Sequence, residues 1–335
     1  MANAFDPNAV DVAVIQVKPG IGDVIWHLPF IRAIAAATAG GRIVFLAPPS
    51  SGAKELLAAE PSVAETIYFR HAGSELQRGI NLIRLATLLR RRRFRSIWIL
   101  DRTTRPAVAA KLARIPLRIG LGLGAQKLFI TNPGIDHSHF HDHPIDWLRA
   151  LMKAMNVPMP AAEPALRLSQ TTLATIGEKF ITLPRQWIVL GIGASHPDKD
   201  WSDHQWAQFL GELRRRTTGT VFLIGGNANR TRAQKFIAAS AGATAVNACD
   251  LSLTEAAALL RHADLFVGPG SGPLNLAAAG ETEAFGLFGT TPILTYSKFI
   301  HAIVPDGGPS PSGMARISPA QVIDTIASRL EDARR

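Results

Sequence analysis

The segment Val12-Ala-Val-Ile-Gln-Val17, followed at once by Lys18-Pro-Gly-Ile-Gly22-Asp23, decides how the start of this chain folds. The first six residues are mostly apolar, which predicts a short buried strand. Two glycines in the next six allow a tight turn, and a helical pattern then runs from Asp23 to about Ala37. The stretch therefore predicts a buried strand, a close turn and a helix in direct succession.

The same succession continues through the first half of the sequence. Apolar runs predict further strands at 42–47, 66–69, 96–100 and 117–120, and helical patterns lie between them at 53–59, 75–92 and 106–114. Strands separated by helices imply βαβ units and a parallel sheet. We therefore expect one doubly wound α/β domain in this half.

Pro158, Pro160, Pro164 and Pro184 mark a candidate linker with one short helix inside, after which the pattern restarts. Strands are expected at 187–191, 221–224, 243–246, 265–267 and 284–288, and helices at 203–215, 230–239, 253–261, 273–279 and 319–330. The sequence thus predicts an α/β protein with two doubly wound Rossmann-like domains. The expected bounds are 1–165 for the N-terminal domain, 166–184 for the linker and 185–335 for the C-terminal domain, with the terminal helix free to pack back on the N-terminal domain.

The loops that follow the strands are the expected place of the site. Ligands of doubly wound sheets bind beyond the carboxyl ends of the strands. The working site is therefore expected in a central cleft between the two halves, lined by these loops.

Composition excludes several classes of protein. The chain has 335 residues, of which 47% are apolar and 19% charged, and this balance is globular rather than disordered. A single cysteine excludes an internal disulfide framework and a multi-cysteine zinc site. No window is apolar enough to span a bilayer, and the first residues lack the order of a secretory signal. We expect a cytoplasmic protein.

The net charge of +10 is distributed unevenly. Residues 1–165 hold 20 Lys and Arg against 12 Asp and Glu (net +8), and residues 166–335 hold 16 against 14 (net +2). The densest cluster, Arg90–Arg95, is either the solvated end of a helix or a surface for an anionic partner. No nucleic-acid partner is expected, because the chain lacks a basic stripe with interleaved aromatic residues.

Asp23 is the first candidate catalytic residue. It falls at the expected start of a helix, beside Gly20 and Gly22, which let the backbone come close to a ligand. One interpretation is an N-cap aspartate that satisfies free N–H groups. The other is a carboxylate kept ionised by the helix dipole and able to act as a general base.

Three loops of the second half suit a phosphate. Gly191–Trp201 places small residues and Lys199 after a strand, and Gly268–Asn275 places three glycines and a serine at the start of a helix. Phe288–Pro292 is a further glycine-containing loop after the next strand. Each alone also fits an ordinary polar or packing turn, but together they could surround a diphosphate.

Histidines alternate at positions 137, 139, 141 and 143. On a strand, such residues share one face and can bind a transition metal. The other interpretation is a polar loop before a helix that begins near Pro144. No metal site is predicted, since nothing else in the sequence requires one.

Taken in order, the loops resemble those of the ADP-heptose:lipopolysaccharide heptosyltransferase family. The matching pieces span most of the chain and are Val17–Val24 with Leu28-Pro29, Gly193–Ser195 with Lys199–Trp201, Ile224–Gly226, Leu265–Gly268 with Ser271–Pro273, Leu276–Ala279, and Phe288–Thr290 with Pro292. The resemblance implies a GT-B fold and an inverting, metal-independent glycosyl transfer. It implies no cofactor besides the donor, a nucleotide sugar that is expected to be ADP-linked.

Roles for single residues follow from the same resemblance. It implies that Asp23 is the catalytic base and that Lys18, Gly20 and Gly22 contact the acceptor. It implies donor contacts from Ser195, Lys199, Gly270, Ser271, Gly272, Asn275, Gly289, Thr290 and Thr291. The acceptor would be an anionic glycan or glycolipid of the lipopolysaccharide type, and the basic first half would meet it at the inner face of the inner membrane.

The sequence departs from the family pattern on the donor side. The family usually has Asp where this chain has Gly270 and His where it has Asn275, and it often has an acidic residue near Asn227–Arg230. These departures leave open another donor sugar, a protein acceptor, or a non-catalytic protein that only binds sugar nucleotides.

Overall fold

The computed structural model describes residues 10–136, 138–139, 142–159, 163–194, 196–294 and 296–332. The chain divides into two compact units, residues 1–162 and 163–335. The segment expected as a linker, 166–184, is thus counted with the second unit. In the described part of the chain, no helix combines the length and the hydrophobicity that crossing a membrane requires.

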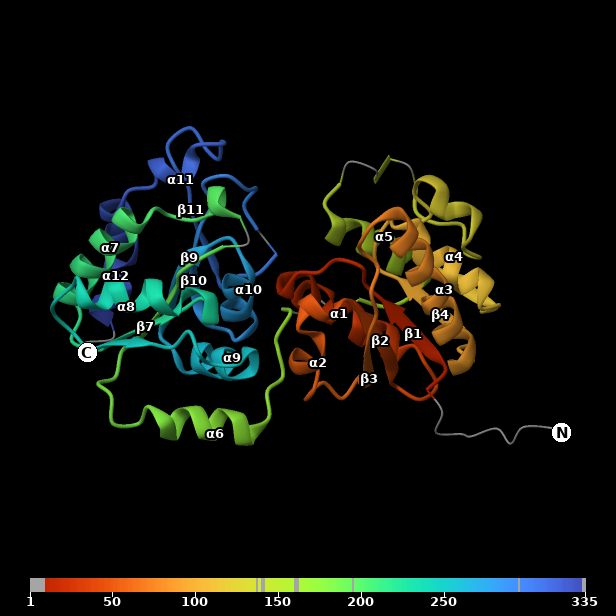
Figure 1. Ribbon diagram of the computed structural model, residues 1–335, viewed down its shortest axis with the longest axis horizontal. Coiled ribbons are helices and arrows are strands. Elements are labelled where there is room, and N and C mark those ends of the chain that lie inside the picture. Colours follow the sequence, from red (N-terminus) through yellow and green to blue (C-terminus); the bar gives the residue numbers. More distant parts are fainter. Residues whose placement is uncertain are drawn as a thin grey trace. The chain divides into compact units, whose positions relative to one another are not determined.

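The N-terminal unit contains a parallel sheet with the strand order β3-β2-β1-β4-β5 (Figure 1). Its strands are β1 (Val12–Ile15), β2 (Ile43–Ala47), β3 (Val63–Tyr68), β4 (Ser96–Ile99) and β5 (Leu117–Ile119). All four residues of β1 are buried, because this strand pairs with β2 on one side and β4 on the other. Its continuous apolar run follows from that position.

Helices cover this sheet on both faces. They are α1 (Ile21–Ala36), α2 (Ala53–Leu56), α3 (Glu75–Arg92), α4 (Thr104–Leu112) and α5 (Pro144–Ala154), with 3-10 turns η1 (Pro49–Ser51) and η2 (Gly124–Leu128). Helices α3 and α4 lie against each other (Figure 1). Leu85 and Leu89 of α3 join Ile15 and Ile97 of the sheet in one buried cluster. A capping box of Ser74 and Gln77 starts α3.

The C-terminal unit contains a second parallel sheet, with the order β11-β10-β9-β6-β7-β8. Its strands are β6 (Trp187–Gly191), β7 (Thr220–Ile224), β8 (Ala245–Asn247), β9 (Leu265–Pro269), β10 (Glu283–Leu287) and β11 (Ile300–Ile303). The sequence analysis did not predict β11, whose burial is incomplete at the edge of the sheet. The other strands were predicted as strands.

The helices of this unit are α6 (Gln170–Lys179), α7 (Asp203–Arg216), α8 (Arg230–Ala238), α9 (Leu253–His262), α10 (Gly272–Ala279), α11 (Gly313–Arg316) and α12 (Pro319–Asp332), with 3-10 turns η4 (Pro197–Lys199) and η5 (Asn227–Asn229). Helix α6, which lies in the expected linker, packs on α9. Helix α12 packs on α7, and its Val322 and Ile326 share a core with Trp206 and Phe209 of α7. Both helices therefore contribute to the C-terminal unit.

Each sheet has one point where the winding direction reverses. In the N-terminal unit this point lies between β1 and β4, and in the C-terminal unit it lies between β6 and β9. Loops at the carboxyl ends of these strands leave the sheet in opposite directions and form a crevice suited to a ligand. The loops after β1, β4, β6 and β9 are therefore the first places to look for a site.

Candidate active site

Asp23 lies in the first turn of α1, three residues beyond the N-cap, Gly20. Its carboxylate accepts a hydrogen bond from the Gly20 backbone. A Cβ atom at position 20 would lie 2.7 Å from Oδ2 of Asp23, so glycine is needed for this close approach. Asp23 is thus not the N-cap itself, but it satisfies a free N–H of the helix from inside the first turn.

The environment of Asp23 raises the pKa of its carboxyl group. Burial is the largest cause, and the nearby carboxylate of Asp101 acts in the same direction. Lys18 lowers the pKa in part, with Nζ at 3.6 Å from Oδ1 of Asp23. The side chain of Asp23 stays 31% exposed, so a substrate hydroxyl can reach it. A reachable carboxylate of raised basicity is suited to general-base catalysis.

Asp101 fixes the loop that carries Lys18 and Asp23. It follows β4 at the reversal point, and its two carboxylate oxygens accept hydrogen bonds from the backbone N–H groups of Val17 (2.9 Å) and Thr103 (2.8 Å). The sequence analysis missed this residue. Its position directly after the apolar run 96–100 was the available signal, since neighbouring parallel strands end at the same edge.

Gln16 and His27 hold the same loop from its buried side. Both side chains are buried, and Nδ1 of His27 lies 2.5 Å from Oε1 of Gln16. The amide of Gln16 then donates to the carbonyl oxygen of Lys18 at 2.8 Å. His27 lies one helical turn after Asp23, so the strand end and the helix start are tied together.

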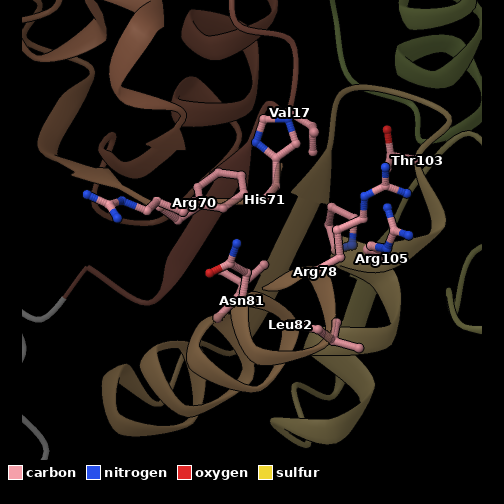
Figure 2. A pocket seen from close by; sticks show the side chains of 11 residues that line it. Val17, Arg70, His71, Arg78, Asn81, Leu82, Thr103 and Arg105 are labelled. Atoms are coloured by element: carbon pink, nitrogen blue, oxygen red, sulfur yellow. The ribbon is translucent and has the colours of Figure 1, made fainter. Parts of the chain in front are cut away.

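A pocket with several cationic side chains opens beside this loop (Figure 2). It lies beyond the carboxyl ends of β1, β3 and β4, and α3 and α4 close it. In Figure 2, Arg78 and Arg105 lie on the same side as Thr103, and His71 lies beside Val17. The residues that line it are Val17, Phe69, Arg70, His71, Arg78, Asn81, Leu82, Leu85, Thr103, Arg105 and Pro106.

The electrostatics of this pocket favour an anionic group. Three arginines line the pocket, and two carboxylates lie close to it. Glu75 at the rim lies 2.6 Å from Arg78 and 3.9 Å from Arg105, and Asp101 acts on the ring of His71. Burial lowers the pKa of His71, so its ring is mainly neutral at pH 7 and can accept or donate a hydrogen bond. The sequence analysis did not predict this pocket. The signals were Arg70-His71 after one expected strand and Arg105 after another.

The C-terminal unit brings most of the donor-side candidates together at one end of its sheet. Gly270 follows β9, and its N–H donates to the carbonyl oxygen of Leu287 in β10 at 3.1 Å. A Cβ at Gly270 would lie 3.3 Å from Oγ1 of Thr291, so the loops after β9 and β10 are in contact. Ser271 is the N-cap of α10, and Gly272 and Asn275 lie in its first turns.

Three polar side-chain atoms of these loops are buried and have no hydrogen-bond partner among the described residues. They are the Oγ atom of Ser271, the Oδ1 atom of Asn275 and the Oγ1 atom of Thr290. Buried polar atoms are nearly always hydrogen-bonded, and each unpaired one is costly. Three such atoms around the N-terminus of α10 indicate a place that a ligand with hydrogen-bonding oxygens completes.

Two donor-side glycines have a packing role. A Cβ at Gly289 would lie 2.3 Å from the backbone nitrogen of Met314 in α11. A Cβ at Gly270 would lie 2.9 Å from the ring of Phe288, whose side chain is buried. The aspartate that the family usually has at position 270 therefore has no room beside Phe288.

Lys199 lies in η4, well beyond the end of β6, and is half-buried. In the described part of the chain, it makes no hydrogen bond or ion pair to Ser271, Asn275 or Thr290. The role of Lys199 on the donor side therefore stays a prediction. Ser195 lies outside the described residues.

A hollow of the C-terminal unit lies between the loop after β6 and α11. Gly193 and Ala194, Asn229 after β7, and Ser312 and Met314 contribute to its wall. Asn229 lies where the family often has an acidic residue, and its amide donates to the carbonyl oxygen of Gly225. The wall therefore offers neutral groups at this position.

The histidine run does not form a metal centre in the described residues, which contain no cluster of His, Cys, Asp and Glu suited to a metal ion. Nδ1 of His139 lies 2.7 Å from Asp142, and His143 caps α5 by accepting a hydrogen bond from the N–H of Ile145. His137 and His141 lie outside the described residues. The interpretation as a polar loop before a helix agrees with the two described histidines.

The family model for glycosyltransferase family 9 (heptosyltransferase) matches residues 82–300, well over half of the chain. The chain belongs to glycosyltransferase family 9. The matched region of this family 9 protein includes the loops after β6, β9 and β10 and begins after Asp23. Curated protein sequences give no significant match.

Solved structures of family 9 proteins share the fold. Heptosyltransferase II of E. coli, an ADP-heptose LPS heptosyltransferase, is 21% identical with a TM-score of 0.78, covering 97% of this chain and 100% of its own. A family 9 glycosyltransferase of Veillonella parvula is 18% identical with a TM-score of 0.77, covering 99% and 100%. E. coli heptosyltransferase WaaC with ADP-2-deoxy-2-fluoro heptose is 16% identical with a TM-score of 0.71, covering 95% and 99%. These similarities confirm the expected GT-B fold.

Proposed function

We propose that this family 9 protein is an inverting, metal-independent glycosyltransferase. It moves a heptose or a related sugar from a nucleotide diphosphate donor, expected to be ADP-linked, to an anionic glycan or glycolipid of the lipopolysaccharide type. The observation that carries this proposal is the reachable Asp23 carboxylate of raised pKa next to a loop that borders an arginine-lined pocket.

In the proposed reaction, an acceptor hydroxyl oxygen attacks the anomeric carbon of the donor sugar. Asp23 takes the hydroxyl proton as the new carbon–oxygen bond forms. The bond between the anomeric carbon and the diphosphate oxygen breaks, and the nucleoside diphosphate leaves with the electron pair. Attack opposite the leaving group inverts the anomeric carbon.

The two loops at the start of α10 would stabilise the leaving diphosphate. The helix N-terminus offers free N–H groups, and Ser271 and Thr290 offer buried hydroxyls with no partner in the described ranges. Lys199 would supply a mobile positive charge, and Ser195, Gly272 and Thr291 would contribute neutral hydrogen-bonding groups. Lys18, Gly20 and Gly22 would shape the acceptor side around Asp23.

The arginine-lined pocket would hold an acidic group of the acceptor. Arg70, Arg78 and Arg105 can bind a carboxylate or phosphate through paired N–H donors. A cytoplasmic enzyme in peripheral contact with the inner membrane would meet such an acceptor as a glycolipid.

The test measures ADP release from ADP-heptose in the presence of a heptose-free lipopolysaccharide acceptor. Asp23→Asn should lower the rate by roughly 10²- to 10⁴-fold, the usual contribution of a general base, and should leave donor binding in calorimetry unchanged. Asp146→Asn, in the first turn of α5, is the matched control and should retain activity. Equal rates for Asp23→Asn and the wild type would refute the assigned role.

Gly270 and Asn275 favour a second candidate, a family member that binds sugar nucleotides without transferring the sugar. Both replace side chains that the resemblance places on the donor. A calorimetric screen of nucleoside diphosphates and their sugars distinguishes the two. Donor binding without turnover, unaffected by Asp23→Asn, would support the second candidate, and binding of another nucleotide sugar with turnover would change the donor assignment.

A further inference from the structure

Helix α3 carries an apolar ridge on its outer side. Leu76, Ile80 and Ile83 are 76%, 41% and 65% exposed. Their spacing of four and three residues places them on one face of the helix. Leu85 and Leu89 lie on the opposite face and are buried against the sheet, so the ridge points away from the core of its unit.

Beyond Glu75, which starts the helix and pairs with Arg78, the charges along this ridge are all positive. The sequence contains no Asp or Glu from Leu76 to Leu100. Arg84, Arg90 and Arg91 are exposed and form no ion pair with the described residues. Surface helices of globular proteins usually carry both acidic and basic residues, which stabilise the helix through ion pairs between residues three or four apart. After Glu75, the exposed apolar side chains of α3 are therefore accompanied by arginines of which three form no ion pair within the described part of the chain.

We propose that this surface, the α3 face (Leu76, Ile80, Ile83, Arg84, Arg90 and Arg91), docks on a lipid bilayer rich in anionic phospholipid. A helix that lies in the membrane interface combines apolar side chains, which enter the acyl boundary, with arginines, which pair with lipid phosphates. Charge complementarity selects an anionic bilayer over a neutral one. Three apolar side chains are a small area for a stable protein interface, and the α3 face lacks the aromatic residues that stack on nucleic-acid bases.

The place of α3 in the fold connects the α3 face to the pocket. The same helix lines the pocket with Arg78, Asn81 and Leu82 (Figure 2). Docking through the α3 face would hold this pocket near the headgroup layer. A glycolipid acceptor could then present its acidic group without leaving the bilayer, and this last step rests on the proposed function.

The test measures co-sedimentation of the full chain with vesicles of phosphatidylcholine alone or mixed with phosphatidylglycerol. The protein should bind the mixed vesicles, and added salt should weaken binding because surface charges are screened. Leu76→Ser/Ile80→Ser/Ile83→Ser should abolish binding, and Arg84→Gln/Arg90→Gln/Arg91→Gln should weaken it by about fivefold per arginine. Ile181→Ser, an equally exposed apolar residue of the other unit, should bind as the wild type does.

Controls separate docking from folding and from catalysis. The mutated side chains are exposed, so thermal unfolding of the variants should match that of the wild type. Transfer to a delipidated acceptor should also be unchanged, which makes vesicle binding independent of the donor assignment. Equal binding to both kinds of vesicle, or unchanged binding of the serine variant, would overturn the proposal. A dimer of the wild type that the serine variant loses would assign the α3 face to a second copy instead and overturn it too.

Discussion

The ammonium group of Lys18 lies 3.6 Å from the carboxylate of Asp23, so the proposed base has a counter-charge on its own loop. Burial raises the pKa of Asp23, and Lys18 limits this rise. The net effect makes the carboxylate more basic than an exposed aspartate. The loop thus sets both the position and the protonation of the residue.

Replacing Lys18 should therefore shift the pH dependence of transfer. Asp23 accepts a proton only when ionised, so the rate falls as pH decreases through its pKa. Lys18→Met removes the lowering effect, the pKa of Asp23 rises further, and the acidic limb of kcat/KM moves to higher pH. Lys54→Met, in the same unit and away from Asp23, should leave the limb in place. A limb that stays fixed in Lys18→Met would show that another group titrates.

Phe288 should block the carboxylate that the family usually has at position 270. The ring lies 2.9 Å from where a Cβ atom of residue 270 would be, and it is buried. Gly270→Asp alone should lower the free energy of unfolding by about 1–3 kcal/mol, as overpacking does. Gly270→Asp/Phe288→Ala should recover part of this loss relative to Phe288→Ala alone, measured in a double-mutant cycle by urea unfolding. Additive effects would contradict a clash between the two side chains.

Most of the fold could be predicted from the sequence because its strands are buried runs between helical segments. The strand β1 and its helix α1 follow directly from 12–37, and both sheets were expected to be parallel. Strand β11 was missed because Ile300–Ile303 is short and only partly buried. Helix α6 was read as part of a linker because prolines surround it, whereas its packing on α9 is a tertiary contact that no local pattern reveals.

Candidate site residues could be predicted only where the relevant side chains stand close together in the sequence. Asp23, Ser271 and Thr290 stand in or directly after glycine-containing turns that follow strands, and this local pattern made them candidates. Asp101 and the arginine-lined pocket depend on residues from separate strands that the sheet order β3-β2-β1-β4 brings to one edge. Without that order, Arg70 and Arg105 are isolated charges.

The hydroxyl of Thr290 should lower the stability of the free protein and strengthen the binding of a nucleoside diphosphate. Its buried hydroxyl has no hydrogen-bond partner in the part of the chain that the structure describes. Thr290→Val therefore removes a desolvated group and should raise the melting temperature of the free protein. The same change should weaken binding of a nucleoside diphosphate by about 1–2 kcal/mol, roughly tenfold, measured by calorimetry.

The matched control for Thr290 is Thr282→Val. The hydroxyl of Thr282 is buried but donates to the carbonyl oxygen of Leu260 at 2.6 Å, before the start of β10 and away from the loops at its carboxyl end. This substitution should lower the melting temperature and leave nucleotide binding unchanged. A Thr290→Val protein that is destabilised as Thr282→Val is would mean that Thr290 has a partner within the fold.

His27 should make the N-terminal unit sensitive to acid. Burial lowers the pKa of His27 from 6.5 to about 3 in the folded chain. Below pH 6.5, His27 is therefore protonated in the unfolded chain but stays neutral in the folded chain. The free energy of unfolding consequently decreases as pH falls from 6.5 towards 3. At pH 5 this loss is about 2 kcal/mol.

His27→Gln keeps a donor for Gln16 but cannot titrate, so its unfolding free energy should change less between pH 7 and 5 than that of the wild type. Urea unfolding of the N-terminal unit at both pH values measures the difference, and His301→Gln, in the other unit, serves as control. Parallel pH curves for His27→Gln and the wild type would show that His27 takes up its proton in the folded state.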